Sequence, residues 1–550
     1  MQIELRDPNI IMKLSRLGSF HQSKISFLRS FLEEFKNWEF NRDLFDLDEN
    51  GYGEAVYSLK KNKRIYSLIC FANALSDDER SDRVIATKWD AAFVLHDGIP
   101  TKKDISRLKI NVPKQEVGRV SYKELTLSRA NKSLRVFNHV VESLTNGKQP
   151  NNKILSDVGY LYRTTAVYGS GKFGLADRFR LKNRNEINGP FRLEMMLVYL
   201  IRQFTFDHVN HIAKCKNPQK SIQLDDKVSR SLGIGNSTGL GMAPFIVNHP
   251  TLLNNWILAR EKSLKKIREI KTIALKDKEI FLNCLSNSYK NITSWNTDSD
   301  FQKKKINQLI IDLKKLNQYL KNEFDFNKNY PFNELYLWIE KNLNEECIEY
   351  TVSMMMEPYS EIVNPYIKEM SSDEEKYFNI PTDRTIYDLR NILENKYKEI
   401  IKIDFSKKEN NQNFWFISKN KEEPRIANRY EEQGHELEQP LAIARDIKKL
   451  YQKIFTEKNS LPIGKFLINN NELRHVVRRA FIVEKFPYAE IQDNIIGSKL
   501  VPIDMLRLKL SFFGAMKFDP RSDKWLRITM FQGAPLAKEL NNLNEHWMYN

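Results

Sequence analysis

Two glycine-rich stretches hold the residue types best suited to binding a small ligand. The first, YRTTAVYGSGKFGLADRFR, covers 162–180, and the second, SLGIGNSTGLGMAPF, covers 231–245. Glycines let backbone N–H groups converge on an anion, and a helix that begins beside them adds a favourable partial charge. Both stretches therefore predict a cradle for a carboxylate or phosphate group, and their shared composition predicts that they lie against each other. The alternative is that they are turns and close packing contacts.

The first stretch combines glycines with cations. Its glycines have GxGxxG spacing, but no acidic residue marks the end of a second strand, which disfavours a dinucleotide site. Phe173 stands where a phosphate-binding P-loop needs Ser or Thr. An anion site that uses the nearby positive charge is still predicted, against the alternative of charges that face solvent. The glycines and cations concerned are Gly169, Gly171, Gly174, Arg163, Lys172, Arg178 and Arg180.

The second stretch places three small polar side chains between two pairs of glycines. Polar groups of a buried loop must find hydrogen-bond partners, so these side chains suit a carboxylate, phosphate or amide ligand. The alternative is an interior crossover that needs glycine for close packing, with a positive φ angle expected at Gly235. The predicted binding residues are Asn236, Ser237 and Thr238, the backbone of Gly233, Gly235, Gly239 and Gly241, and His249 just before a helix.

The same stretch contains a GxSxG pattern with Ser237 in the nucleophile position. A nucleophile elbow needs a buried strand before the turn and a helix directly after it. The preceding DDKVSRSLGI is a poor buried strand, and Gly241 and Pro244 oppose an immediate helix. The pattern therefore does not predict a hydrolase, and the catalytic residues stay unassigned.

A secondary basic cluster lies in ELRHVVRRAF. Its members are one helical turn apart, and like charges on one helix face repel, so they need acidic partners or an anion. Glu484, Glu490 and Asp493 are near in sequence and favour structural ion pairs. The alternative is an anionic ligand or a nucleic acid. The cluster consists of Arg474, His475, Arg478 and Arg479.

Metal-binding patterns are weak throughout the sequence. His208 and His211 are three residues apart on an expected helix, but no third ligand is within reach, so they predict an ordinary polar helix face. DLDENG begins like a calcium loop, but Tyr57 occupies the position that needs a bidentate Glu, which favours a turn. No metal site is predicted, and the sequence identifies no cofactor.

Composition indicates a soluble globular protein with a basic excess. The net charge is +17, but Lys and Asn are spread over the whole chain, which is typical of compositional drift rather than of a clustered nucleic-acid footprint. Any nucleic-acid binding is therefore expected to be weak and salt-sensitive. There are four cysteines without a CxxC motif, and no apolar leader or membrane span is evident, so a cytoplasmic location is predicted.

The distribution of glycine indicates where helices lie. Nine of the 20 glycines fall within 159–241, and none falls within 242–433. Because glycine destabilises a regular element by roughly 0.5–1 kcal/mol relative to alanine, the glycine-free region is predicted to be helical. Hydrophobic periodicity predicts helices over 122–144 and 191–214.

These patterns predict an α+β fold, predominantly helical, with short antiparallel hairpins near both termini. The N-terminal hairpin is placed around KKNK at 60–63, and the C-terminal one pairs 506–512 with 525–531 because apolar and polar residues alternate there. The predicted segments are a mixed α+β region (1–148), a glycine-rich ligand-site segment (149–248), a helical region (249–410) and an α+β region (411–550).

The sequence as a whole favours an enzyme that acts on a small anionic substrate held by the glycine-rich loops and basic residues. A nucleic-acid-binding protein is the first alternative, and a structural or interaction protein is the second. The reaction type and the oligomeric state are not predicted.

Overall fold

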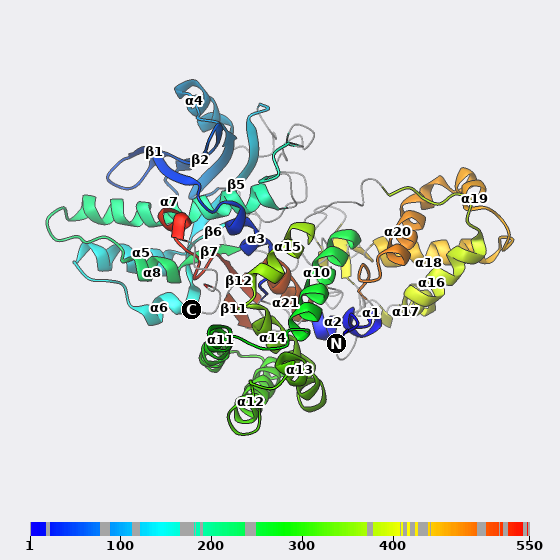
Figure 1. Ribbon diagram of the computed structural model, residues 1–550. Helices are drawn as coiled ribbons and strands as arrows, with labels where there is room; N and C mark the ends of the chain where they lie inside the picture. Colours follow the sequence, from blue (N-terminus) through cyan, green and yellow to red (C-terminus); the bar gives the residue numbers. More distant parts are fainter. Residues whose placement is uncertain are drawn as a thin grey trace. The chain divides into compact units, whose positions relative to one another are not determined.

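The computed structural model divides the chain into two compact units, which are described separately (Figure 1). Unit 1 contains Met1–Ile25, Leu240–Phe512 and Pro520–Leu526, and unit 2 contains Ser26–Gly239, Phe513–Asp519 and Arg527–Asn550. The structure describes residues 2–17, 23–76, 88–112, 121–164, 181, 183–187, 191–236, 249–370, 378–407, 409–410, 415–418, 424–426, 438–440, 442–491, 502–515, 517–520, 526–542 and 547.

The described strands of unit 2 form one nine-stranded sheet in the order β1-β2-β3-β4-β5-β6-β7-β12-β11. Strands β1 to β6 pair antiparallel with their neighbours, β6 and β7 run parallel, and β7 pairs antiparallel with β12. Their bounds are β1 (Glu39–Leu47), β2 (Gly53–Lys61), β3 (Arg64–Ala72), β4 (Ala91–Asp97), β5 (Glu124–Lys132), β6 (Tyr160–Thr164), β7 (Gly233–Asn236), β11 (Lys517–Pro520) and β12 (Leu526–Met530).

Helices cover both faces of this sheet. The long α7 packs across strands β2 to β7 (Figure 1). Val56 and Val94 belong to a buried cluster that includes Leu108 of α4, whereas the neighbouring Phe93 meets Phe204 of α7. Successive strand residues point to opposite faces, so a strand buried on both sides reads as a continuous apolar run. The helices of unit 2 are α3 (Phe27–Glu34), α4 (Lys102–Asn111), α5 (Leu134–Thr145), α6 (Asn152–Val158), α7 (Arg192–Lys216), α8 (Asp226–Ser231) and the 3-10 helix η10 (Ala537–Asn542).

Unit 1 is mainly helical. Its helix α10 begins with Pro250 in the first turn, where proline loses no hydrogen bond. A three-stranded antiparallel sheet, in the order β10-β8-β9, consists of β8 (Trp415–Ser418), β9 (Pro424–Ile426) and β10 (Glu438–Pro440). The helices are α1 (Pro8–Ile11), α2 (Leu14–Leu17), α10 (Pro250–Arg268), α11 (Leu275–Thr293), α12 (Asp300–Asn322), α13 (Pro331–Asn342), α14 (Glu345–Met356), α15 (Ser360–Met370), α16 (Ile386–Lys396), α17 (Lys398–Lys402), α18 (Ala442–Phe455), α19 (Ile463–Asn469), η9 (Asn471–Leu473), α20 (Arg474–Lys485) and α21 (Pro502–Phe513).

Helices α16 to α20 share a hydrophobic core of their own within unit 1. Ile447, Leu450 and Ile454 of α18 are fully buried in it, together with Leu389 of α16 and Val477 of α20. These apolar residues recur every three or four positions, which is the spacing of one helix face. The polar residues of α18 are therefore turned away from this core.

The predicted α+β class with mostly helical content is confirmed, but the strands are not confined to hairpins near the termini. The residues over 506–512 form helix α21, not a strand. The alternation of apolar and polar residues predicted a strand with one exposed face. Arg507 and Lys509 are in fact as buried as the neighbouring leucines. Arg507 Nη1 lies 2.5 Å from Asp504 Oδ1, three residues earlier, which is a helical spacing. The C-terminal strand neighbours are instead β11 and β12.

The helix predicted over 122–144 is wrong in its N-terminal half, which forms a strand. Residues Glu124–Lys132 form strand β5, and the helix begins only at Leu134. Leu125, Thr126, Leu127 and Ser128 are all buried, so the strand is covered on both faces. Pairing with β4 and β6 therefore outweighs the helical spacing of the apolar residues.

Among the described residues, no helix has both the length and the apolar composition needed to cross a bilayer.

A buried arginine ties α7 to two connecting segments of unit 2. Arg202 is 1% exposed, and its guanidinium donates hydrogen bonds to carbonyl oxygens instead of to a carboxylate. Its Nε lies 2.8 Å from Leu232 O, its Nη2 2.9 Å from Ala534 O and its Nη1 3.1 Å from Pro535 O. Burial lowers the pKa of Arg202 to about 10, so the group stays charged at neutral pH and the carbonyl dipoles must balance that charge.

Replacement of this arginine tests how far unit 2 depends on it. We expect Arg202→Met to lower the free energy of unfolding by about 3 kcal/mol, because several buried carbonyl groups lose their donor. Thermal melts followed by circular dichroism measure the change, with Lys214→Met, on the exposed end of the same helix, as the matched control. Equal melting temperatures for the two variants would contradict this account.

Candidate functional site

The two glycine-rich stretches leave the sheet of unit 2 at adjacent positions. Strands β6 and β7 are parallel neighbours, and Thr164 and Asn236, the last residue of each strand, are paired. Residues 165–180 follow β6 in the sequence, and residues 237–248 follow β7. The parts of the two stretches beyond the strands therefore follow two paired strand ends. In parallel sheets, ligands bind outside the carboxyl ends of the strands.

Small polar side chains gather at this edge of the sheet, where the paired ends of β6 and β7 lie. Thr164 is fully buried, and its Oγ1 lies 2.5 Å from Oγ of Ser128 on β5. Asn236 is 6% exposed, and its register with Thr164 places both side chains on the same face of the sheet. Thr529 of β12, paired with Gly235 and therefore on the opposite face, is also buried, and its hydroxyl has no hydrogen-bond partner among the described residues. Because buried polar groups need partners, this edge is a candidate ligand site.

Gly233 and Gly235 have a packing role that the structure shows directly. A Cβ atom at Gly235 would lie 2.7 Å from the ring of Tyr160, and one at Gly233 would lie 2.2 Å from Met530 O. Neither glycine has a positive φ angle. The expected reason for glycine at 235 is therefore wrong, because space for the Tyr160 ring requires it and backbone conformation does not. Their predicted contribution to a ligand cradle stays a prediction.

The remaining residues predicted for this site divide into two groups. Arg163 is half-buried in β6, opposite Gly235 of β7. His249 directly precedes α10 in unit 1 and makes no side-chain cap to that helix. The others lie outside the described residues, so their predicted contacts stay predictions: Gly169, Gly171, Lys172, Gly174, Arg178, Arg180, Ser237, Thr238, Gly239 and Gly241.

The histidines of α7 hold a turn. Nε2 of His208 lies 2.9 Å from Gly51 O, and its Nδ1 lies 3.1 Å from the hydroxyl of Tyr162. Burial lowers the pKa of His208 to about 3, so its ring is neutral at pH 7, with Nε2–H donating to the carbonyl and Nδ1 accepting from Tyr162. Nε2 of His211 lies 2.8 Å from Asp48 O in the same turn. Both rings are therefore engaged by the β1–β2 connection.

The DLDENG sequence forms that turn. Oδ1 of Asp48 accepts hydrogen bonds from the backbone N–H of Asn50 and of Tyr52, both at 2.9 Å. An Asp side chain that accepts from the backbone two residues later is an Asx turn, as expected when the calcium pattern is incomplete. Within the described part of the chain, no group of three or more His, Cys, Asp or Glu is arranged to hold a metal ion.

The secondary basic cluster on α20 is mostly engaged by other groups of unit 1. Arg479 Nη2 lies 2.8 Å from Glu490 Oε2, and both side chains are buried. His475 Nε2 lies 2.8 Å from Asp446 Oδ2, and Arg478 Nε lies 3.2 Å from Phe378 O. Arg474 is exposed and borders a hollow of about 560 Å³ together with Thr382, Gly464 and Asn471. Binding of an anion by this cluster stays a prediction.

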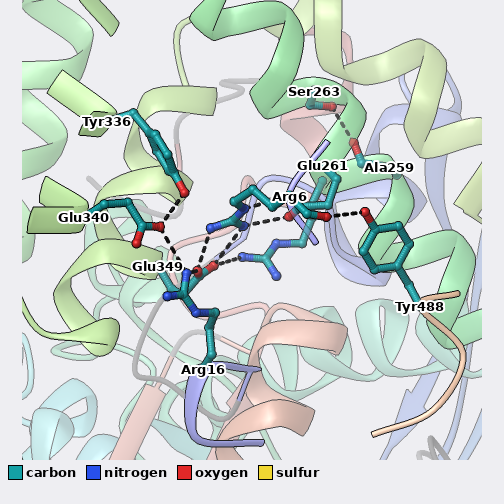
Figure 2. A network of polar contacts seen from close by, with 10 residues as sticks. Arg6, Arg16, Ala259, Glu261, Ser263, Tyr336, Glu340, Glu349 and Tyr488 are labelled. Atoms are coloured by element: carbon teal, nitrogen blue, oxygen red, sulfur yellow. Dashed lines mark hydrogen bonds and ion pairs between the residues drawn. The ribbon is translucent and has the colours of Figure 1, made fainter. Parts of the chain in front are cut away.

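A larger cluster of charged groups, which the sequence analysis missed, is buried in unit 1 (Figure 2). The carboxylate of Glu349 on α14 receives hydrogen bonds from three arginines, at 2.8 Å from Arg6, 3.0 Å from Arg16 and 3.0 Å from Arg260. Arg6 also makes a bidentate contact with Glu261 of α10, with its Nε 2.7 Å and its Nη2 2.6 Å from the two carboxylate oxygens. The cluster thus joins the N-terminal segment to α10 and α14.

The electrostatics of the cluster follow from burial and charge together. Burial alone would raise the pKa of the Glu349 carboxyl, but the three guanidinium groups outweigh it and hold this pKa well below its ordinary value. Burial lowers the pKa of Arg260, whose Nε and Nη1 have no hydrogen-bond partner among the described residues. Each charge is therefore costly to bury alone and depends on the others.

The contacts of this cluster give it a structural role. Tyr336 donates to Glu340, which lies 3.2 Å from Arg16, and the Tyr488 hydroxyl lies 2.7 Å from Arg6 O. The partners are up to 482 residues apart in the sequence, so local pattern could not connect them. The one signal in the sequence was Glu349 itself, an acidic residue within the apolar run CIEYTVSMMM.

Comparison of the chain with protein-family models, with curated proteins and with solved structures finds no match. The geometry described above is therefore the whole basis for the proposals that follow.

The pH dependence of stability tests the buried cluster. The pKa of Glu349 is depressed in the folded state, so its contribution is fully present above its ordinary pKa of 4.5 and is lost as pH falls through the folded-state pKa. We expect Glu349→Gln to lower the free energy of unfolding at pH 7 by about 3 kcal/mol, because three arginines lose a shared partner. The difference from wild type should narrow between pH 5 and pH 3.

Thermal melts of both proteins at pH 7, 5, 4 and 3 measure this difference. Glu334→Gln removes a carboxylate from an exposed ion pair with Lys328 and serves as the control, for which a small, pH-insensitive effect is expected. A difference between wild type and Glu349→Gln that stays constant over this range would show that the carboxylate does not carry the stabilisation.

Proposed function

We propose that the chain is an enzyme that binds a small anionic substrate at the carboxyl ends of β6 and β7. The observation that carries this proposal is the pairing of Thr164 with Asn236. It makes two glycine-rich stretches, far apart in the sequence, continue from paired strand ends at one sheet edge. A substrate bearing a carboxylate or phosphate group fits the donors predicted there.

The described residues at this edge support the proposal by their chemistry. Ser128 and Thr164 carry hydroxyl groups and Asn236 carries an amide on the same face of the sheet, so these residues offer hydrogen-bond donors without a negative charge. Neutral donors around buried backbone N–H groups suit an anion, which a carboxylate in the same place would repel. The predicted cations Lys172 and Arg178 would supply the positive charge.

Packing alone accounts for only part of this arrangement. Close approach explains Gly233 and Gly235, because the Tyr160 ring and the Met530 carbonyl occupy the space of a side chain. The Thr164 hydroxyl is satisfied by Ser128, but packing does not explain a buried amide at Asn236, since an apolar residue of similar size would fill the same volume without the cost of desolvation. A binding role accounts for both features.

A substitution at Asn236 separates binding from packing. We expect Asn236→Ala to weaken ligand binding at least tenfold, roughly the effect of losing one hydrogen bond to a charged group, with a melting temperature close to that of wild type. A thermal-shift screen of inorganic phosphate, nucleoside monophosphates and short-chain carboxylates identifies the ligand, and calorimetry compares the two proteins.

Gly235→Ala is the matched packing variant one residue away. Its added methyl group meets the Tyr160 ring, so it should lower the melting temperature strongly, and the double variant Gly235→Ala with Tyr160→Leu should recover part of the loss. A large loss of melting temperature in Asn236→Ala, with ligand binding retained, would contradict the proposed site and leave packing as the role of this edge.

A further inference from the structure

A basic hollow lies between the end of α17 and the exposed face of α18 in unit 1. Its volume is about 400 Å³, and four cationic side chains border it against one acidic side chain. Most of the chain's positive charge is spread out, so this concentration is unusual for the molecule. The bordering residues are Lys402, Ile403, Asp404, Phe405, Ser406, Arg445, Lys448, Lys449 and Gln452.

The sequence of α18 turns these cations to one side. Arg445, Lys448, Lys449 and Gln452 follow the spacing i, i+3, i+4, i+7 and so share one helix face. The opposite face is fully buried in the core that α18 shares with α16 and α20. The helix therefore cannot rotate to separate its charges. Like charges one turn apart repel, so this face is destabilised unless an anion is present.

The nearby acidic groups are already engaged. The carboxylate of Asp404 accepts from the backbone N–H of Ser406 at 3.0 Å and from its hydroxyl at 2.6 Å. Asp446, the acidic residue of α18, pairs with His475. Within the described residues, neither Arg445 nor Lys449 forms an ion pair. Lys448 donates to Ile401 O and Lys402 pairs with Glu399, so the positive charges left for a partner are those of Arg445 and Lys449.

We propose that this basic hollow binds the phosphodiester backbone of a nucleic-acid strand. Arg445 and Lys449 are four residues apart, or about 6 Å along the helix axis, so the cations form a row rather than a single point. A row of cations matches the regularly spaced phosphates of one strand better than it matches a single small anion. Lys402 of α17 borders the same hollow, but it is already paired with Glu399, 3.6 Å away, so the row consists of the cations of α18.

The aromatic ring beside the cations favours a single strand. Phe405 borders the hollow, with one part of its side chain packed against the core of α16 to α20 and the other part exposed. Proteins that bind single strands combine a positively charged groove with aromatic side chains on which bases stack. The surface is compatible with weak, salt-sensitive binding, because a few phosphate contacts act mainly by counterion release. This binding is independent of the substrate site proposed in unit 2.

Fluorescence anisotropy of a fluorescein-labelled, mixed-sequence, 20-nucleotide single-stranded DNA tests the proposal with the full chain. We expect micromolar binding near 50 mM salt that weakens steadily up to 300 mM. The double variant Arg445→Gln with Lys449→Gln should bind at least tenfold more weakly. The slope of log affinity against log salt should become shallower by about 1.4, because each phosphate that a cation neutralises on a single strand contributes about 0.7 to it.

A second double variant removes the same charge elsewhere in unit 1. Lys303→Gln with Lys304→Gln, at the exposed start of α12, should keep the wild-type affinity and salt slope. Neither double variant should melt below wild type, because these side chains lie outside the core, and the α18 variant should melt slightly higher because it loses a like-charge repulsion. An equal loss of binding in the two variants would show diffuse attraction and overturn the proposal. No binding to the oligonucleotide, or complete displacement by millimolar inorganic phosphate, would also overturn it.

Discussion

The buried carboxylate of Glu349 is the constraint on which unit 1 depends. It lies on an apolar helix with 1% of its side chain exposed, and an ionised group in that environment is stable only when cations surround it. Two of its three arginine partners, Arg6 and Arg16, come from the N-terminal segment. The charge of Glu349 is therefore compensated only when this segment is folded against α10 and α14. The packing of the N-terminal segment is thus a consequence of electrostatics as well as of apolar burial.

Unit 2 also contains a buried charge, but different groups compensate it. Arg202 is as buried as the arginines around Glu349, but backbone carbonyl groups of two connecting segments receive its hydrogen bonds. Burial lowers the pKa of this guanidinium, as it lowers that of Arg260 beside Glu349, so in both cases the partners offset the cost of burial only in part. In both units, one long cationic side chain holds together segments that are distant in the sequence. Because a buried cation without partners is costly, only the fold that brings these segments to the side chain is stable.

Local sequence pattern predicted the elements whose burial is one-sided or whose length is large. It placed α7 and α10 and the hairpin of β2 and β3, since periodicity and turn residues determine these. It failed over 506–512 and 124–132, where polar residues are buried through partners that only the tertiary fold supplies. It selected Asn236 but took it for a loop residue instead of the end of strand β7, and it missed the neighbouring Ser128, because two successive strand pairings, β5 with β6 and β6 with β7, bring these residues together.

The net charge indicates how well the chain could bind an external anion only after the cations that already contact protein groups are set aside. Arg6, Arg16 and Arg260 neutralise buried carboxylates, and Arg479 does the same beside Glu490, so they offer nothing to an external partner. The secondary basic cluster of α20, dense in sequence, is largely engaged in this way. The cations of α18 are less conspicuous in the sequence, yet their helix holds them facing outward. Anion affinity therefore follows from which positive charges the fold leaves without a carboxylate, and the sequence alone does not distinguish them.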